Sequence, residues 1–127
     1  MAIDDKTEKR DITMTKNKLL FYDKNNDILA IHKGFSADEK FKGNIDAGQL
    51  VLDVSTKGRV VGIEIMHATE FFALFTIGRD ILENLEDAKF TVTINPNGIV
   101  LGISFKVRNR EEEIPAKIAV PLEVSTR

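Results

Sequence analysis

The chain has no cysteine and no tryptophan, and only three prolines and one tyrosine occur among its 127 residues. Without cysteine, disulfide bonds, thiol catalysis and thiolate metal sites are excluded. The chain also lacks a surplus of either charge, because 18 basic and 20 acidic residues leave a net charge of −2. This balance gives no general attraction to nucleic acids or anionic membranes. We therefore expect no nucleic-acid partner unless the fold creates a local basic patch.

Long apolar runs are also missing, and every apolar stretch is shorter than the roughly 18 residues that a membrane-spanning helix requires. Residues 1–16 are polar and show no sustained periodicity, so we expect a flexible lead followed by a single domain over residues 17–127. The lead has no apolar core of the kind found in signal peptides. We therefore expect a cytoplasmic protein without a membrane partner.

The chain contains one pattern twice, with its copies 40 residues apart. Residues 50–65 and 90–105 each have an alternating apolar run, a four-residue turn that ends in glycine, and a second alternating run. This pattern is typical of a β-hairpin, and turn-forming residues between apolar runs predict one more hairpin earlier in the chain. We expect hairpins at residues 17–33, 48–66 and 88–108, the last two forming an internal repeat.

Alternation along these strands predicts the side chains that face the core, because successive residues point to opposite faces of a sheet. The inward residues of the first copy and then of the second are Leu50, Leu52, Val54, Val61, Ile63 and Ile65, and Phe90, Val92, Ile94, Leu101, Ile103 and Phe105. The opposite faces are polar. A sheet with one apolar face and one solvent-exposed polar face is typically antiparallel.

Both copies place glycine at the end of their turn. The segment Asn95-Pro96-Asn97-Gly98 suits a type I turn followed by a residue with left-handed backbone, and residues 55–58 end in Gly58 in the same frame. We predict that Gly58, Pro96 and Gly98 are structural turn residues.

Between the two copies, residues 69–86 carry apolar side chains at three- and four-residue steps, which predicts one amphipathic helix. The last element, residues 114–123, contains Pro115 and Pro121, which remove backbone donors and place it at a sheet edge. The predicted fold class is therefore α+β. We expect an antiparallel sheet of about seven strands packed against one helix.

Two groups of polar residues are candidate sites. Asp23, Asn25 and Asp27 have the spacing that opens a calcium loop, although Ile28 stands where such a loop needs glycine, so a plain hairpin turn is the competing interpretation. The second group is Asp53 and Glu64, which lie in the predicted strands of one hairpin, and His67, which follows that hairpin; the other histidine, His32, also follows a predicted strand. On one sheet surface they could bind a metal or transfer a proton, and the competing interpretation is a solvated polar face.

The pair Phe71-Phe72 has one ring too many for a narrow apolar stripe. Phe72 is therefore either a core residue or an exposed contact in a dimer. Further along the chain, Lys106, Arg108 and Arg110 alternate and could form a small basic strip, while the three glutamates that follow them indicate a charged loop.

Two segments of the chain resemble a known family. Tyr22-Asp23 precedes Asp27, and a later segment combines Leu52-Asp53 with Gly62-Ile63-Glu64-Ile65. Over residues 17–70 the chain resembles the prokaryotic domain of unknown function 2283. The resemblance implies a small β-rich fold with no assigned activity, no established catalytic residue, and possible partnership with small toxin-like proteins. The predicted helix and second hairpin copy depart from the family pattern.

The leading hypothesis is a non-catalytic interaction or scaffold domain that self-associates as a homodimer or binds a protein partner, because sheet edges invite pairing. One alternative is a small hydrolase or metal-dependent enzyme that uses Asp53, Glu64 and His67. A further alternative is a regulatory, antitoxin-like protein or a nucleic-acid binder. No motif implies a cofactor.

Overall fold

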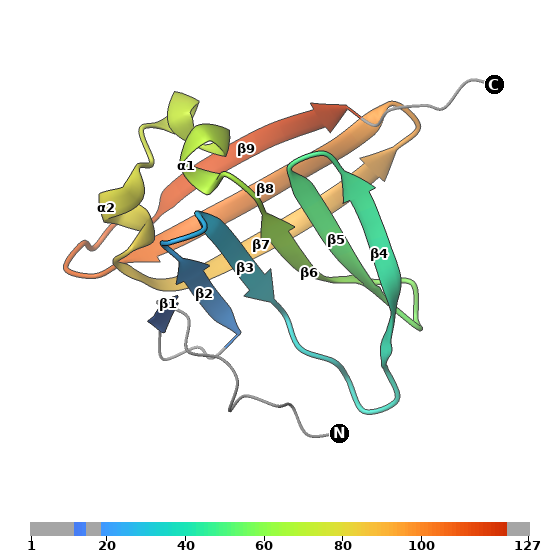
Figure 1. Cartoon of the computed structure of the whole chain (residues 1–127). Helices are drawn as coiled ribbons and strands as arrows, with labels where there is room; N and C mark the ends of the chain where they lie inside the picture. The colour runs from blue at the N-terminus through green and yellow to red at the C-terminus, as the bar shows by residue number, and fades with distance from the viewer. Residues whose placement is uncertain (1–11, 15–18, 122–127) are drawn as a thin grey trace.

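The computed structural model describes residues 12–14 and 19–121 of the chain. Most of the predicted flexible lead, residues 1–16, lies outside the described residues, and its residues 12–14 form a short strand. The structure is sheet-rich α+β, with antiparallel pairing throughout the described strands (Figure 1). No helix in the described part of the chain is long and apolar enough to span a bilayer.

The larger sheet, sheet A, has six strands in the order β1-β2-β3-β6-β5-β4. Its two ends are therefore β1 and β4, and the chain crosses from β3 to the far edge before it returns through β5 and β6. The strands are β1 (Ile12–Met14), β2 (Leu20–Asp23), β3 (Ile28–His32), β4 (Phe41–Ala47), β5 (Leu50–Ser55) and β6 (Val60–Ile65). The hairpins β2–β3 and β5–β6 lie where the alternation of apolar and polar residues predicted them.

The smaller sheet, sheet B, has three strands in sequential order: β7 (Leu85–Asn95), β8 (Gly98–Val107) and β9 (Ile114–Pro121). The hairpin β7–β8 and the edge position of β9 agree with the sequence pattern. The predicted final strand extended to residue 123, of which residues 122 and 123 lie outside the described part.

The two sheets pack face to face, and a single apolar core draws on both (Figure 1). The prediction of one sheet of about seven strands against a helix is wrong, because the hairpin β5–β6 lies in sheet A and β7–β8 in sheet B. Each hairpin therefore buries its apolar face against the other sheet. Most predicted inward residues are buried or half-buried, but Ile94, near the tip of β7, is 49% exposed.

The predicted helix over residues 69–86 is also wrong. The structure has α1 (Ala68–Phe71), a 3₁₀ turn η2 (Ala73–Phe75) and α2 (Arg79–Leu82), and the strand β7 already begins at Leu85. Thr76 has a left-handed backbone with φ 54°, and Gly78 is extended, so the helix is broken twice. Of the predicted apolar stripe, Ile81, Leu82 and Leu85 are buried in the core, whereas Leu74 is 96% exposed. Burial in the tertiary structure thus keeps part of the stripe in the core without a continuous helix.

Strand β4 occupies a segment that the sequence pattern left as a connection. Its seven residues include Gly43, Asn44 and Asp46, which have low strand propensity. Pairing with β5 supplies the backbone hydrogen bonds that hold it extended, and a bulge interrupts the ladder between Phe41 and Gly43. β4 is therefore a strand because of tertiary context.

The two predicted turn glycines have different roles. Gly58 has φ 77°, as the turn prediction required. Gly98 does not have a positive φ, and it pairs directly with Asn95 across a two-residue loop of Pro96 and Asn97. The prediction of a left-handed Gly98 is wrong. Glycine is needed there because a Cβ would lie 2.6 Å from the backbone oxygen of Val120 in β9.

Candidate functional site

The predicted group Asp53, Glu64 and His67 is only partly brought together. Asp53 on β5 pairs with Gly62, and Glu64 on β6 pairs with Val51, so both carboxylates lie on the outer face of sheet A, which points away from sheet B. His67 follows β6 with a left-handed backbone at φ 50° and is exposed at the start of α1. It therefore does not share the row of residues that crosses the sheet at Asp53.

His32 lies in that row instead. It pairs with Gly62 on one side of β6, and Asp53 pairs with Gly62 on the other. A Cβ added at Gly62 would lie 2.7 Å from Cδ2 of His32 and 2.8 Å from Oδ2 of Asp53, so the imidazole and the carboxylate both lean over the glycine. Sequence reasoning missed this neighbour because the pairing of β3 with β6 joins segments about 30 residues apart.

The polar row has partners within the protein. The backbone N–H of Gly34 donates to Nδ1 of His32 at 2.8 Å, and the side-chain amide of Asn44 donates to Asp53 at 2.6 Å. Within residues 12–14 and 19–121, no group of three or more histidine or acidic side chains is arranged to hold a metal ion. The metal-dependent alternative therefore gains no assembled set of ligands from the described residues.

The candidate calcium residues act as hydrogen-bond acceptors for protein groups. Asp23 is buried, and its carboxylate accepts from the backbone N–H and the side-chain amide of Asn26 at 3.2 and 2.9 Å. Asp27 has φ 56° and points its carboxylate at residues outside the turn, whereas Asn25 is exposed. This geometry fits the competing interpretation, a hairpin turn built from turn-forming residues.

Asp27 joins the first hairpin to α1. Its carboxylate accepts from the hydroxyl of Tyr22 at 2.5 Å, from the hydroxyl of Thr69 at 2.7 Å and from the backbone N–H of Thr69 at 3.2 Å. Burial alone would raise the pKa of Asp27, but these hydrogen bonds more than offset that effect and hold the pKa below its ordinary value. Tyr22 and Asp27, two residues of the motif that suggested the family, are thus structural.

Phe72 is fully buried, so of the two interpretations left open by the sequence the core residue is confirmed and the exposed interface residue is wrong. Its ring lies edge-on to Phe71 and Phe105, with centroids 5.2 and 5.4 Å away. These contacts place Phe72 between α1 and sheet B, within the core cluster. Truncating it would open a cavity in the core instead of separating two copies.

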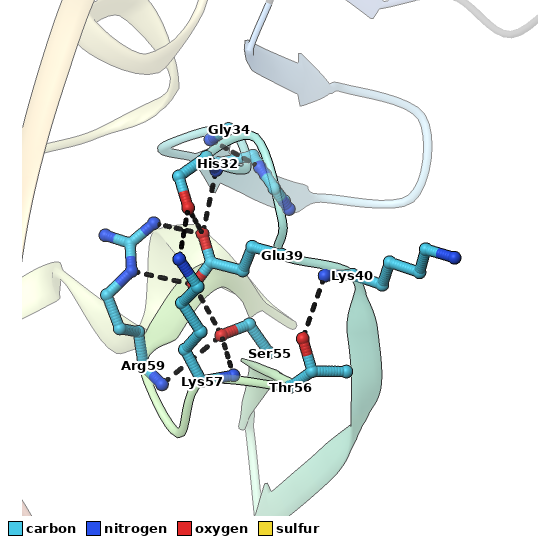
Figure 2. A network of polar contacts seen from close by, with 9 residues as sticks. His32, Gly34, Glu39, Lys40, Ser55, Thr56, Lys57 and Arg59 are labelled. Atoms are coloured by element: carbon cyan, nitrogen blue, oxygen red, sulfur yellow. Dashed lines mark hydrogen bonds and ion pairs between the residues drawn. The ribbon is translucent and has the colours of Figure 1, made fainter.

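A buried carboxylate that the sequence did not reveal fixes the long connection between β3 and β4, residues 33–40 (Figure 2). The side chain of Glu39 is inaccessible to solvent, and the guanidinium of Arg59 donates to both of its oxygens, at 2.8 and 2.6 Å. The hydroxyl of Ser55 donates to Glu39 at 2.5 Å, and the backbone N–H of Ser36 donates at 2.9 Å. Every oxygen of this buried carboxylate therefore has partners.

The network lowers the pKa of Glu39 far below its ordinary value, chiefly because of the hydrogen bonds from Arg59 and also through Ser36 and Ser55. It also ties the β3–β4 connection to the β5–β6 turn, because Arg59 and Ser55 flank that turn. The connection is thereby anchored to the β5–β6 turn at the end of sheet A. The connection presents the ring of Phe35, which is 45% exposed, and the ring of Phe41, the first residue of β4, is 53% exposed.

Taken together, the fold and these polar networks define a small sheet-rich α+β protein in which the motif residues Tyr22, Asp23 and Asp27 form hydrogen bonds within the chain. The chain belongs to the family described as Protein of unknown function (DUF2283), which matches residues 20–68. That segment runs from β2 to the start of α1 and contains Tyr22, Asp27 and Gly62. The family resemblance noted in the sequence is confirmed.

An uncharacterized protein of Methanocaldococcus jannaschii is 33% identical to the chain over 94 residues, which cover 73% of this chain and 76% of the relative. The similarity therefore extends beyond the family segment of residues 20–68. No solved structure matches the chain.

Proposed function

We propose that the protein is a non-catalytic interaction domain that associates with a second copy through the free edge of β4. The observation that carries this proposal is the position of β4 at the end of sheet A, where no described strand pairs with its outer edge. An unpaired edge offers a row of backbone donors and acceptors to another strand. Pairing between identical edges produces a two-fold dimer, the commonest form of homo-oligomer.

The edges of the two sheets are protected to different degrees. β9, at one edge of sheet B, carries Pro115 and Pro121, which have no N–H to offer a neighbouring strand. β4 has no proline, and its bulge at Lys42 leaves a regular stretch from Gly43 to Ala47. This stretch is therefore the part of β4 that supports pairing with a second copy.

The register of such a pair follows from the faces of the strand. Residues directly opposite each other in two antiparallel copies of β4 must lie on the same face of the extended sheet. If the two-fold axis passes through the centre of the regular stretch, Ile45 lies opposite Ile45 of the second copy. Ile45 and Ala47 are half-buried against the core, so their side of the pair would be apolar. On the other side, Asn44 would face Asp46 of the second copy, where an amide donor meets a carboxylate.

Cysteine pairs test this arrangement directly, because the natural chain has no cysteine. We expect the variant Asn44→Cys/Asp46→Cys to form a disulfide-linked dimer of about twice 14.2 kDa on mild oxidation. Each single variant should link much more slowly, since its two sulfur-bearing residues would be displaced along the strand by about 7 Å. The matched control is Lys117→Cys/Ala119→Cys on the edge strand β9, which should remain monomeric in a non-reducing gel.

The native chain should sediment as a dimer in analytical ultracentrifugation at concentrations near 100 μM, a range typical of weak association. A monomer at that concentration, with no link through β4, would refute self-association. The remaining half of the proposal, a protein partner, would then be tested by co-purification from the native host and mass spectrometry. Failure of both experiments would reject the interaction role.

A further inference from the structure

One end of the molecule carries a surplus of positive charge that the overall composition hides. We name residues 33–42 and 56–59 the basic end; they comprise the β3–β4 connection, the start of β4 and the β5–β6 turn. The basic end contains five basic residues and two acidic ones, whereas the whole chain has a net charge of −2. One of the two acids, Glu39, is buried and paired with Arg59, so it does not neutralise the exposed lysines.

The lysines of the basic end are exposed to solvent. In Figure 2, the side chain of Lys40 extends away from the Glu39 network. Lys57 lies beside that network, and its ammonium donates to the hydroxyl of Ser36 at 3.4 Å. The basic strip suggested by the sequence, Lys106, Arg108 and Arg110, does not run along one strand. β8 ends at Val107, and Lys106 lies 3.9 Å from the carboxylate of Glu86.

Two aromatic rings are interleaved with these lysines. Phe35 and Phe41 belong to the few large apolar side chains that the described residues leave exposed. The rings of Phe35 and His32 form a T-shaped pair with centroids 5.0 Å apart. Phe35 and Phe41 therefore add exposed aromatic surface to the charged face.

The two rings lie near opposite ends of the β3–β4 connection. Phe35 lies three residues beyond the end of β3 and Phe41 begins β4, and these two strands are three positions apart in sheet A. The hydrogen bonds of Glu39 fix the connection between the rings, so binding need not order a mobile loop.

A cleft of about 380 Å³ adjoins this surface, and residues of both sheets line it. Its lining includes the apolar side chains of Val60, Val92 and Ile94 and the cations Lys33 and Arg59. The ammonium of Lys33 lies 4.5 Å from the centre of the Phe90 ring, a cation–π contact. The basic end is therefore partly concave as well as charged.

We propose that the basic end binds single-stranded nucleic acid, with lysines contacting phosphates and with bases stacking on Phe35 and Phe41. Sequence-tolerant recognition of single strands combines these two elements, positive charge along the backbone and aromatic platforms for bases. A duplex keeps its bases stacked internally, and an acidic peptide needs the charges but not the two rings. The inference goes beyond the interaction role proposed above, and it does not depend on pairing through β4.

The test is fluorescence anisotropy with a fluorescein-labelled oligothymidine of about 12 nucleotides, a length within known single-strand site sizes. At about 50 mM salt we expect saturable binding, and we expect affinity to fall steeply as salt rises. The probes for comparison are a duplex of the same length and polyglutamate, each measured with the full chain.

Removing the rings tests the stacking. We expect Phe35→Leu/Phe41→Leu to weaken oligothymidine binding at least about 10-fold, because each stacked base contributes substantially to affinity. The control is Leu74→Ala, which alters a side chain that is 96% exposed and lies in the 3₁₀ turn η2. It should leave the affinity unchanged. Circular dichroism melting would verify that each variant is folded.

Removing the charges tests the role of the lysines at the phosphates. For Lys40→Gln/Lys42→Gln/Lys57→Gln we expect the slope of log K against log salt to become shallower by about 2, or about 0.7 for each phosphate that a lysine no longer neutralises. The matched control is Lys89→Gln/Lys117→Gln, two exposed lysines on sheet B, which should keep the original slope.

Three results would overturn the proposal. The first is no change in anisotropy with protein at about 100 μM in low salt. The second is equal affinity for the duplex together with insensitivity to the Phe35→Leu/Phe41→Leu change, which would indicate charge attraction alone. The third is binding of polyglutamate as tight as that of oligothymidine, which would assign the surface to an acidic protein. None of these results bears on the dimer, because the cysteine and sedimentation experiments use no nucleic acid.

Discussion

Replacing Asp27 should detach the first hairpin from α1, and the size of the effect follows from the hydrogen bonds that the carboxylate makes. The carboxylate of Asp27 accepts from the hydroxyl of Tyr22 and from the hydroxyl and backbone N–H of Thr69. Tyr22 is only 1% exposed, so its hydroxyl would be left without this acceptor inside the protein. An unsatisfied buried donor carries the full cost of its lost hydration.

The magnitude comes from two contributions. Hydrogen bonds to a charged group stabilise a protein by about 1.5–3 kcal/mol each, less than additively when they share one acceptor, and a buried unpaired hydroxyl costs about 1–3 kcal/mol. We expect Asp27→Ala to lower the free energy of unfolding by about 3–5 kcal/mol. For a domain of this size, that change lowers the melting temperature by on the order of 10–20 °C.

The variant Asp27→Asn separates the charge from the backbone conformation. Asp27 has φ 56°, a left-handed conformation that asparagine adopts readily and alanine does not. Asparagine keeps one acceptor oxygen but replaces the other with an NH₂ group, which repels the donors of Thr69. We therefore expect a smaller loss than with alanine, about 1–3 kcal/mol.

The assay is urea and thermal unfolding followed by far-UV circular dichroism, applied to a double-mutant cycle of Asp27→Asn and Tyr22→Phe. Since the two side chains are in direct contact, their effects should deviate from additivity by about 0.5–3 kcal/mol. The control pair is Asp27→Asn with Lys117→Gln, a residue on the outer face of sheet B, whose effects should add.

The pH dependence has a definite sign. Hydrogen bonding holds the pKa of Asp27 in the folded protein below its ordinary value of 3.8. Its contribution to stability is therefore present above about pH 4 and is lost as pH falls through the lower pKa of the folded state. The difference in stability between the native chain and Asp27→Asn should shrink over that acidic range. Melting temperatures within about 2 °C of the native protein for both Asp27 variants at pH 7, with an additive cycle, would refute the reasoning.

Two further predictions concern other structural residues. Gly98→Ala should destabilise the fold by about 1–3 kcal/mol, because its Cβ would meet the backbone of Val120, whereas Gly43→Ala, with open space around it, should melt within about 2 °C of the native protein. Glu39→Gln should lower the melting temperature by several degrees at pH 7 and should flatten its decline below pH 4, since the native Glu39 has a depressed pKa and loses its hydrogen bonds to Arg59 on protonation. Melting curves recorded from pH 7 to pH 2 would check this, and parallel curves for both proteins would contradict it.

The alternation of apolar residues correctly predicted the hairpins and most of their inward side chains. Residues such as Leu52 and Ile63 are buried as expected, because the face of a strand is set by its two-residue period. The same period does not say which strands share a sheet. Consequently the two hairpins were expected in one sheet, and the structure places them in two different sheets.

The helix prediction failed where local conformation overrode periodicity. Three- and four-residue spacing marks the residues that reach the core, but it does not guarantee a continuous helix. Left-handed backbone at Thr76 and extended backbone at Gly78 break the segment into short turns. Strand β4 was not predicted for the opposite reason, since its residues have weak intrinsic preference and depend on pairing with β5.

The candidate sites depended almost entirely on distant contacts. Glu39 gave no sequence signal, because its partners Ser55 and Arg59 lie 16 and 20 residues away. The position of His32, and not His67, beside Asp53 likewise follows from the order of the strands in sheet A.

The amino-acid sequence by itself determined the family, the hairpins and the faces of their strands, because each follows from short-range pattern and local geometry. Only the tertiary structure decided the division into two sheets, the free edge of β4, the core position of Phe72 and the gathering of lysines at one end. The physical reason is that the pairing of strands depends on how apolar side chains from the whole chain are buried together. No single stretch of residues contains that information.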